Sequence, residues 1–266
     1  MDYKDKLLQG FEQHVSGDAL VAYTLYKEIL DADPNNIFAR VLINLMSMQV
    51  SMQRITKKSG LNNLKSCGFN PGTVIDVGAQ VGTPPLYEVF PEAHHVMLEP
   101  VKEHESILAN ICQSLKSAEC MIAAVTSRSG TISLSVTDNL QYASIDCQLG
   151  TLNNNRIIDA ISLNDLCSTR NYTGPYLIKI DVDGVEIEVL KGASSLITPE
   201  NIFVIEATLL DEFPRFSLII DFFRPYGFVL HDIFDHLYRP SDNALWQVDI
   251  VMVHKNHPFR NNHLYS

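Results

Sequence analysis

Apolar residues are spaced in two different ways along the chain. From Lys4 to about Lys58 they recur at helical spacing with no strand signal. From Phe69 onward, short apolar runs alternate with helical patterns, which is typical of a parallel sheet covered on both faces. We therefore predict a helical segment at 1–65 and an α/β domain at 66–266. The strands are expected at 73–77, 95–99, 120–125, 131–136, 176–181, 202–206, 228–232 and 248–254, and the helices at 86–90, 102–115, 185–191 and 216–226.

The helical segment contains one recognisable pattern. Residues 17–45 resemble a single tetratricopeptide helix pair, interrupted at Asp33-Pro34. One pair cannot form a solenoid, because stacked neighbours are what bury the apolar face of each repeat. This segment is therefore expected to be a helical cap, or an element through which a homodimer forms, rather than a peptide-binding array.

Charge and cysteine content narrow the class of function. The 266 residues carry a net charge of −11, which disfavours nucleic acids and anionic membranes as main partners. Lys57 and Lys58, near Arg54, form the one basic cluster, and a solvated helix end is the expected explanation. No apolar run approaches the roughly 18 residues that span a bilayer, and the five cysteines form no CxxC pair. We expect a soluble, cytoplasmic protein with reduced thiols and without a zinc site.

The first predicted strand leads into a glycine loop. Asp76 and Gly78 lie at the tip of this strand, and Gly82 permits a tight turn before Thr83-Pro84, which suits a helix start. The next strand ends in Glu99, 23 residues after Asp76. This spacing fits an acid that binds a ribose.

Two cofactor classes use this layout. A dinucleotide fingerprint requires G-x-G-x-x-G, but Gln80 and Thr83 occupy the second and third glycine positions here. S-adenosylmethionine has a ribose and an adenine but no phosphate, so it tolerates a looser loop. The small residues around Ala124, at the end of the third strand, would leave room for the adenine. S-adenosylmethionine is the better interpretation, and a plain strand-to-helix turn is the structural alternative.

Four carboxylates crowd the stretch that follows the fifth strand. Asp183 and Glu186 have the spacing of a helix capping box, so their expected role is structural. Glu188 is expected to pair with Lys191 on the surface. Asp181 has no capping task and stands at the carboxyl end of a buried strand, where open sheets bind ligands. Asp181 is therefore the best candidate for chemistry.

Two further residues are expected beside Asp181. Lys179 lies on the same side of the strand and could pair with Asp181. Glu206 ends the neighbouring strand, so Asp181 and Glu206 could share a substrate hydroxyl or a divalent cation such as magnesium. Nothing in the sequence supplies a third metal ligand, so no metal is predicted.

Three motifs together resemble the FkbM family of S-adenosylmethionine-dependent methyltransferases: VIDVGAQVG (74–82), LEP (98–100) and LIKIDVDGVEIEVLKGA (177–193). The resemblance, about residues 69–254, implies a Rossmann-like seven-stranded sheet with an antiparallel last strand. It also implies methylation of a hydroxyl oxygen, often on a sugar or natural product, with Asp181 facing the transferred methyl group. Cofactor-binding positions implied by the motifs are Asp76, Gly78, Ala79, Gln80, Gly82 and Glu99.

The sequence departs from the family pattern at two places. Gln80 stands where the family usually has Asn, and residues 138–145 replace a serine-rich loop. The acceptor therefore cannot be assigned by analogy, and Tyr142 and Ser144 are the candidates for contacting it.

The expected reaction is attack of a substrate oxygen on a sulfonium methyl group. Asp181 is the predicted general base, oriented by Lys179 or Glu206, and His231 or His236 is the alternative. A second class of function is a non-catalytic scaffold that uses the N-terminal helices for docking. A nicotinamide-dependent dehydrogenase ranks third, because the middle glycine is missing.

Overall fold

The computed structural model describes residues 3–16, 19–136, 143–145, 155–209 and 215–260. The chain divides into two compact units, Met1–Ile55 and Thr56–Ser266. Within the described ranges, no helix is long and apolar enough to cross a bilayer.

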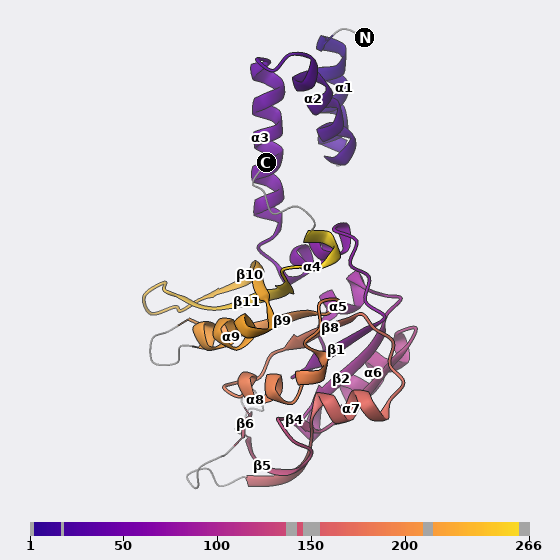
Figure 1. The fold of residues 1–266 in the computed structure, drawn as a ribbon, viewed down its shortest axis with the longest axis vertical. Coiled ribbons are helices and arrows are strands. Elements are labelled where there is room, and N and C mark those ends of the chain that lie inside the picture. The colour runs from indigo at the N-terminus through magenta and orange to yellow at the C-terminus, as the bar shows by residue number, and fades with distance from the viewer. Residues whose placement is uncertain (1–2, 17–18, 137–142, 146–154, 210–214, 261–266) are drawn as a thin grey trace. The chain divides into compact units, whose positions relative to one another are not determined.

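The first unit is helical, as the sequence predicts (Figure 1). The expected helix pair is present, and its second helix starts where the Asn36 side chain accepts a hydrogen bond from Ala39 N at 3.0 Å. Tyr26 and Ile29 are fully buried in a small core between the helices. The three helices are α1 (Tyr3–Ser16), α2 (Ala19–Ala32) and α3 (Ile37–Gln53).

The second unit begins earlier than the sequence pattern suggested. The division falls between Ile55 and Thr56 rather than after residue 65. The reason is that α4 (Lys57–Ser66) packs Leu61 and Leu64 into the core of the second unit, where Gly60 lies against the ring of Phe234. The apolar spacing of this helix resembles that of the helices before it, so the pattern alone could not separate them.

The predicted seven-stranded sheet is confirmed. Its strand order is β10-β11-β9-β8-β1-β2-β3, and the last strand, β11, runs antiparallel to both of its neighbours. The central parallel strands are buried on both faces. The strands are β1 (Thr73–Val77), β2 (His94–Glu99), β3 (Ala118–Ile122), β8 (Tyr176–Ile180), β9 (Ile202–Thr208), β10 (Phe228–Tyr238) and β11 (Leu245–His254).

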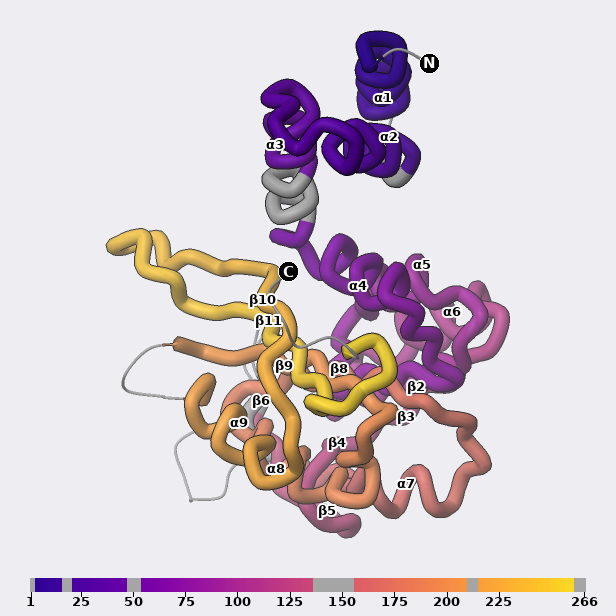
Figure 2. Tube along the Cα trace, turned by 45° about the horizontal axis from the view of Figure 1, so that its top comes forward, coloured from indigo at the N-terminus to yellow at the C-terminus, as the bar shows by residue number. Residues whose placement is uncertain are grey.

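Helices cover both faces of this sheet (Figure 2). Leu61, Leu86 and Leu108, from α4, α5 and α6, belong to the core on one face. Leu163, Val189 and Ile219 of α7, α8 and α9 belong to the core on the other. The remaining helices are α5 (Pro84–Val89), α6 (Glu105–Ser114), α7 (Leu163–Thr169), α8 (Glu186–Lys191) and α9 (Arg215–Phe223), with 3₁₀ turns η1 (Lys102–His104), η2 (Ser194–Leu196), η3 (Arg224–Tyr226) and η4 (Pro258–Arg260).

A second, four-stranded sheet was not predicted. The strand expected at 120–125 is divided: β3 ends at Ile122 in the large sheet, and Ala124 starts β4 in the small one. The split follows from pairing, because β4 bonds with β7, a strand about 30 residues further on that the apolar pattern did not reveal. The small sheet has the order β4-β7-β5-β6 and consists of β4 (Ala124–Val125), β5 (Gly130–Val136), β6 (Ala143–Ile145) and β7 (Asn155–Ile161).

Candidate functional site

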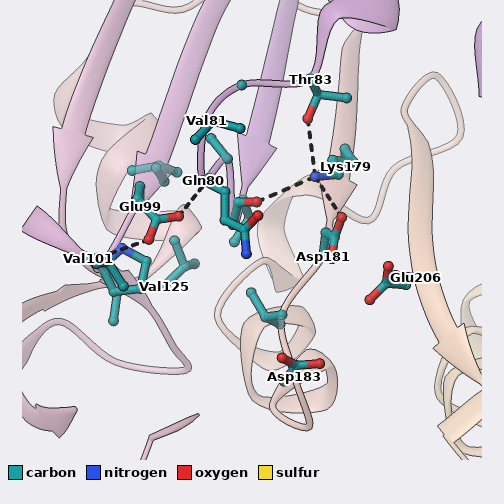
Figure 3. A pocket seen from close by; sticks show the side chains of 18 of the residues that line it. Gln80, Val81, Thr83, Glu99, Val101, Val125, Lys179, Asp181, Asp183 and Glu206 are labelled. Carbon is teal, nitrogen blue, oxygen red and sulfur yellow. Dashed lines mark hydrogen bonds and ion pairs between the residues drawn. The ribbon is translucent and has the colours of Figure 1, made fainter. Parts of the chain in front are cut away.

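A cavity of about 550 Å³ opens at the carboxyl ends of the central strands. This is where open α/β sheets bind ligands, and the volume suits a small-molecule site. Its wall combines the loop after β1, the end of β2, the start of the small sheet and the ends of β8 and β9 (Figure 3). Of the predicted cofactor residues, the cavity is lined by Gly78, Ala79, Gln80, Gly82, Glu99 and Ala124.

The glycine loop after β1 has a backbone that other residues would not allow. Gly78 has φ +79°, and a Cβ there would lie 1.8 Å from the carbonyl oxygen of Asp181. Gly82 has φ +95°, a left-handed conformation that glycine adopts without strain. The loop therefore passes close to the end of β8 and leaves the cavity open above it.

Glu99 connects this loop to the end of β2 through hydrogen bonds. Its Oε2 accepts a hydrogen bond from Gln80 N at 2.8 Å, and its Oε1 accepts one from Val101 N at 2.9 Å. Burial raises the pKa of Glu99, and the two backbone N–H groups oppose this shift. Each carboxylate oxygen has a second lone pair, so Glu99 can still accept hydrogen bonds from ligand hydroxyls.

Lys179 is the centre of a buried charge cluster (Figure 3). Its Nζ lies 3.1 Å from Asp76 Oδ1, 3.0 Å from Asp181 Oδ2 and 3.3 Å from Thr83 Oγ1. Burial disfavours the charged amine, but the two carboxylates outweigh it and raise the pKa of Lys179. The predicted pairing of Lys179 with Asp181 is thus present. The Thr83 hydroxyl accepts a hydrogen bond from Lys179 and does not cap α5.

Asp76 lies deeper than a ligand contact would require. The residue is 1% exposed, and it is not among those that line the cavity. It stands opposite Lys179 in the β1–β8 register. Asp76 therefore holds Lys179 in place beneath the glycine loop.

Asp181 directly follows β8, Glu206 lies on the neighbouring strand β9, and both line the cavity. For Asp181, burial is outweighed mainly by the charge of Lys179, so its pKa is lowered. For Glu206, burial and then the charge of Asp181 raise the pKa to about 9. Glu206 is accordingly the protonated member of the pair at neutral pH, and Asp181 is the charged one.

A second ion-pair cluster on the same wall was not predicted. Lys57 Nζ lies 3.2 Å from Asp235 Oδ2 and 3.1 Å from Asp249 Oδ2, and Lys57 N donates to Asp235 Oδ1 at 3.1 Å. The expectation of a solvated Lys57 is wrong: its side chain is 14% exposed and lines the cavity. These residues are far apart in sequence, so no spacing could have connected them. They meet because α4 lies near β10 and β11 in the folded protein.

The acids after β8 differ from the predicted capping box. The first turn of α8 follows Val185, with no side-chain cap. Glu186 Oε1 instead accepts from Gly184 N at 3.0 Å and from Arg215 Nη1 at 3.2 Å, because Gly184 bends the chain back toward it. Asp183 is exposed on the cavity wall. The predicted surface pair of Glu188 and Lys191 is confirmed at 2.6 Å.

The other candidates do not converge on the cavity. Tyr142 lies outside the described residues, and Ser144 is in β6 with its side chain outside them. His231 contacts Arg260 and the ring of Phe259, and neither His231 nor His236 lines the cavity. Among the residues that the structure describes, no group of three His, Cys, Asp or Glu is placed to hold a metal ion.

Comparisons with known proteins give one family match. Residues 76–230 match the model described as Methyltransferase FkbM domain, which is more than half of the 266 residues. No curated protein matches.

Several solved structures are similar at low identity. A fibrillarin pre-rRNA processing protein from Methanococcus jannaschii is 12% identical with a TM-score of 0.45, over 70% of this chain and 66% of that one. A structure described as a putative RNA methyltransferase from Pyrococcus horikoshii is 16% identical with a TM-score of 0.42, over 74% and 82%. A 1,6-didemethyltoxoflavin-N1-methyltransferase from Burkholderia thailandensis is 12% identical with a TM-score of 0.41, over 73% and 76%. Likeness at this level carries no information about the substrate of this chain.

Proposed function

Because the chain belongs to the FkbM methyltransferase family, we propose that its cavity binds S-adenosylmethionine and that the enzyme methylates a hydroxyl oxygen of a sugar, glycan or natural product. The observation that carries this proposal is that the glycine loop, Glu99 and Asp181 all line the same cavity. The glycine loop and Glu99 suit the binding of a nucleoside, and Asp181 suits the role of proton acceptor.

The lining residues fit the proposed cofactor. The glycine loop passes close to the Asp181 backbone, where a Cβ on Gly78 would clash, and Glu99 offers acceptors for ribose hydroxyls. Ala123, Ala124 and Val125 provide a flat apolar surface at the start of the small sheet, which suits an adenine ring. The acids at the other end of the cavity suit a positive charge.

The bound cofactor would supply an electrophilic methyl group on a sulfonium centre. Asp181 would accept the proton of the substrate hydroxyl as the oxygen becomes the nucleophile. Lys179 fixes the Asp181 carboxylate from one side at 3.0 Å, and Glu206 lies on the neighbouring strand β9 in the same cavity wall. A carboxylate held in this way needs no reorientation when the substrate arrives, which is what proximity catalysis requires.

The acceptor would enter along the wall made by segments outside the matched domain. Lys57, Asp235 and Gln247 line this part of the cavity, and all three lie outside residues 76–230. Their side chains are polar, which suits an acceptor rich in hydroxyl groups. We therefore assign acceptor choice to this wall.

Two measurements test the proposal. Titration calorimetry with S-adenosylmethionine should show saturable binding that weakens in Glu99→Ala, because the variant loses both the ribose acceptor and the support of Gln80. Glu92→Ala is the matched control, since Glu92 is an exposed acid that pairs with Lys116 on the surface. Incubation with methyl-labelled cofactor and fractionated glycans, lipids and small metabolites should then label one hydroxylated product. Binding without any labelled product would favour the scaffold, and absence of binding would refute the proposal.

A further inference from the structure

The first unit, Met1–Ile55, has a small core for its length. Two of the five buried apolar residues in this core are alanines. They are Ala22, Tyr26, Ile29, Ala39 and Met46. Domains of this size are marginally stable, and a disulfide or association with another chain often supports them. Residues 1–55 contain no cysteine, so a disulfide cannot supply this support.

The outer face of α3 carries an apolar stripe. Phe38, Val41 and Leu45 are 73%, 48% and 47% exposed, and they are spaced three and four residues apart. In the sequence, the same spacing continues with Met48 and Met52. Alternating steps of three and four residues form the seam of a coiled coil, in which each apolar side chain inserts between four residues of the facing helix. The stripe therefore suits a second helix with the same repeat.

α3 is the end of the row of helices in the first unit. α2 packs against both α1 and α3, as neighbouring helices do in a tetratricopeptide array (Figure 2). Such an array needs a polar outer face at its ends, whereas the outer face of α3 is apolar. Three helices are one and a half helix pairs, and about three pairs are needed for a stable array. Two copies joined through α3 provide six helices, which meets this requirement.

The charges around the stripe fit a second copy of the same helix. Arg40 is the one charged residue in the sequence of α3, and its position in the repeat is away from the seam. The positions that flank the seam hold Ile37, Leu42, Asn44, Gln49 and Ser51. All five are uncharged, so two copies of α3 can meet without like charges beside the seam. A charged peptide would find no counter-charge there.

The outer face of α1 is less suited to self-association. Leu8, Phe11 and Val15 are also exposed at steps of three and four residues. However, Asp5 and Glu12 are exposed at positions that flank this second stripe. Two copies of α1 would therefore place acids beside the seam, and like charges there oppose pairing.

We propose that the protein forms a homodimer in which Phe38, Val41 and Leu45 of α3 pack against the same residues of a second copy. Both copies contribute the same surface, so the interface closes on itself and adds no third chain. The inference goes beyond the proposed function and does not depend on it, because none of these three residues lines the cavity.

A charge exchange at Leu45 tests this interface. Leu45 is the middle residue of α3 (Ile37–Gln53), so it meets its own copy whether the two helices run parallel or antiparallel. Light scattering after size-exclusion chromatography should give the wild type twice the 29.8 kDa mass of one chain. Leu45→Glu and Leu45→Lys should each give the mass of one chain, because each places two like charges in the seam. A mixture of the two variants should regain the dimer, which also shows that both are folded.

Two further variants complete the test. Phe38→Ser removes the most exposed aromatic side chain of the stripe without adding a charge, and it should raise the dissociation constant at least about tenfold. Phe11→Glu is the matched control, because it introduces the same charge at an exposed aromatic residue on α1, and it should leave the dimer intact. A monomeric wild type, or a dimer that persists in both Leu45 variants and in Phe38→Ser, would overturn the inference. Loss of the dimer in Phe11→Glu alone would also overturn it, because the interface would then lie on α1.

Discussion

Lys179 and Asp76 stand directly opposite each other on β8 and β1, and their side chains form an ion pair of 3.1 Å that is almost completely buried. Lys179→Met should leave Asp76 without its counter-ion. Loss of one partner from a buried pair costs about 3–5 kcal/mol, because the remaining charge stays desolvated. Urea unfolding would measure this loss. Lys191→Met removes an exposed partner of Glu188 and should cost less than about 1 kcal/mol. Equal losses in the two variants would contradict a structural role for Lys179.

Asp181→Asn should separate binding from chemistry. The amide keeps the size of the side chain but cannot accept the substrate proton, so methyl transfer should fall by on the order of 100- to 10,000-fold. Binding of S-adenosylmethionine should remain measurable by calorimetry. Glu188→Gln changes an exposed acid in the same motif and should leave turnover unaltered. Undiminished turnover in Asp181→Asn would remove Asp181 from the mechanism.

Gly78→Ala should disrupt the cavity floor. The new Cβ would meet the Asp181 carbonyl oxygen at 1.8 Å, so the loop after β1 must move. Gly68→Ala is a matched control, because Gly68 also has a positive φ but no atom within 4 Å of the added Cβ. The control should lose about 1–2 kcal/mol from backbone strain alone. Gly78→Ala should lose more in chemical unfolding and should also bind the cofactor weakly, and similar losses would show that close approach at Gly78 is unimportant.

The stability of the protein should depend on Glu206 at alkaline pH. The pKa of this group is about 9 when folded, against an ordinary value of 4.5. Between these values the folded state holds a proton that the unfolded state lacks, so the free energy of unfolding should fall as pH rises, by at most about 1.4 kcal/mol per unit. Urea unfolding from pH 6 to 8.5 would show this slope in the wild type. Glu206→Gln cannot titrate and should have a flatter profile, and equal slopes would disprove a raised pKa.

Local pattern was enough to predict the central sheet. Buried parallel strands are continuous apolar runs, so β1, β2, β8 and β9 were visible, as were Glu99 at the end of β2 and Asp181 directly after β8. The pairing of Lys179 with Asp181 also followed, because side chains two apart on a strand share a face. The strand at 131–136 was predicted, but the small sheet around it was not, because β4 and β6 have only two and three residues and β4 pairs with β7, about 30 residues further along the chain.

Neighbouring residues along the chain were enough to predict three parts of the site: a glycine loop after β1, an acid at the end of β2, and Asp181 after β8. These features are local, because turn geometry and alternation depend on neighbouring residues. The environment of each charged group, by contrast, is set by the fold. The fold buried Asp76 beside Lys179, raised the pKa of Glu206 through burial and the charge of Asp181, and brought Lys57 to Asp235 and Asp249. Ionisation depends on burial and on charges within a few ångströms, and the fold alone sets which residues are that close.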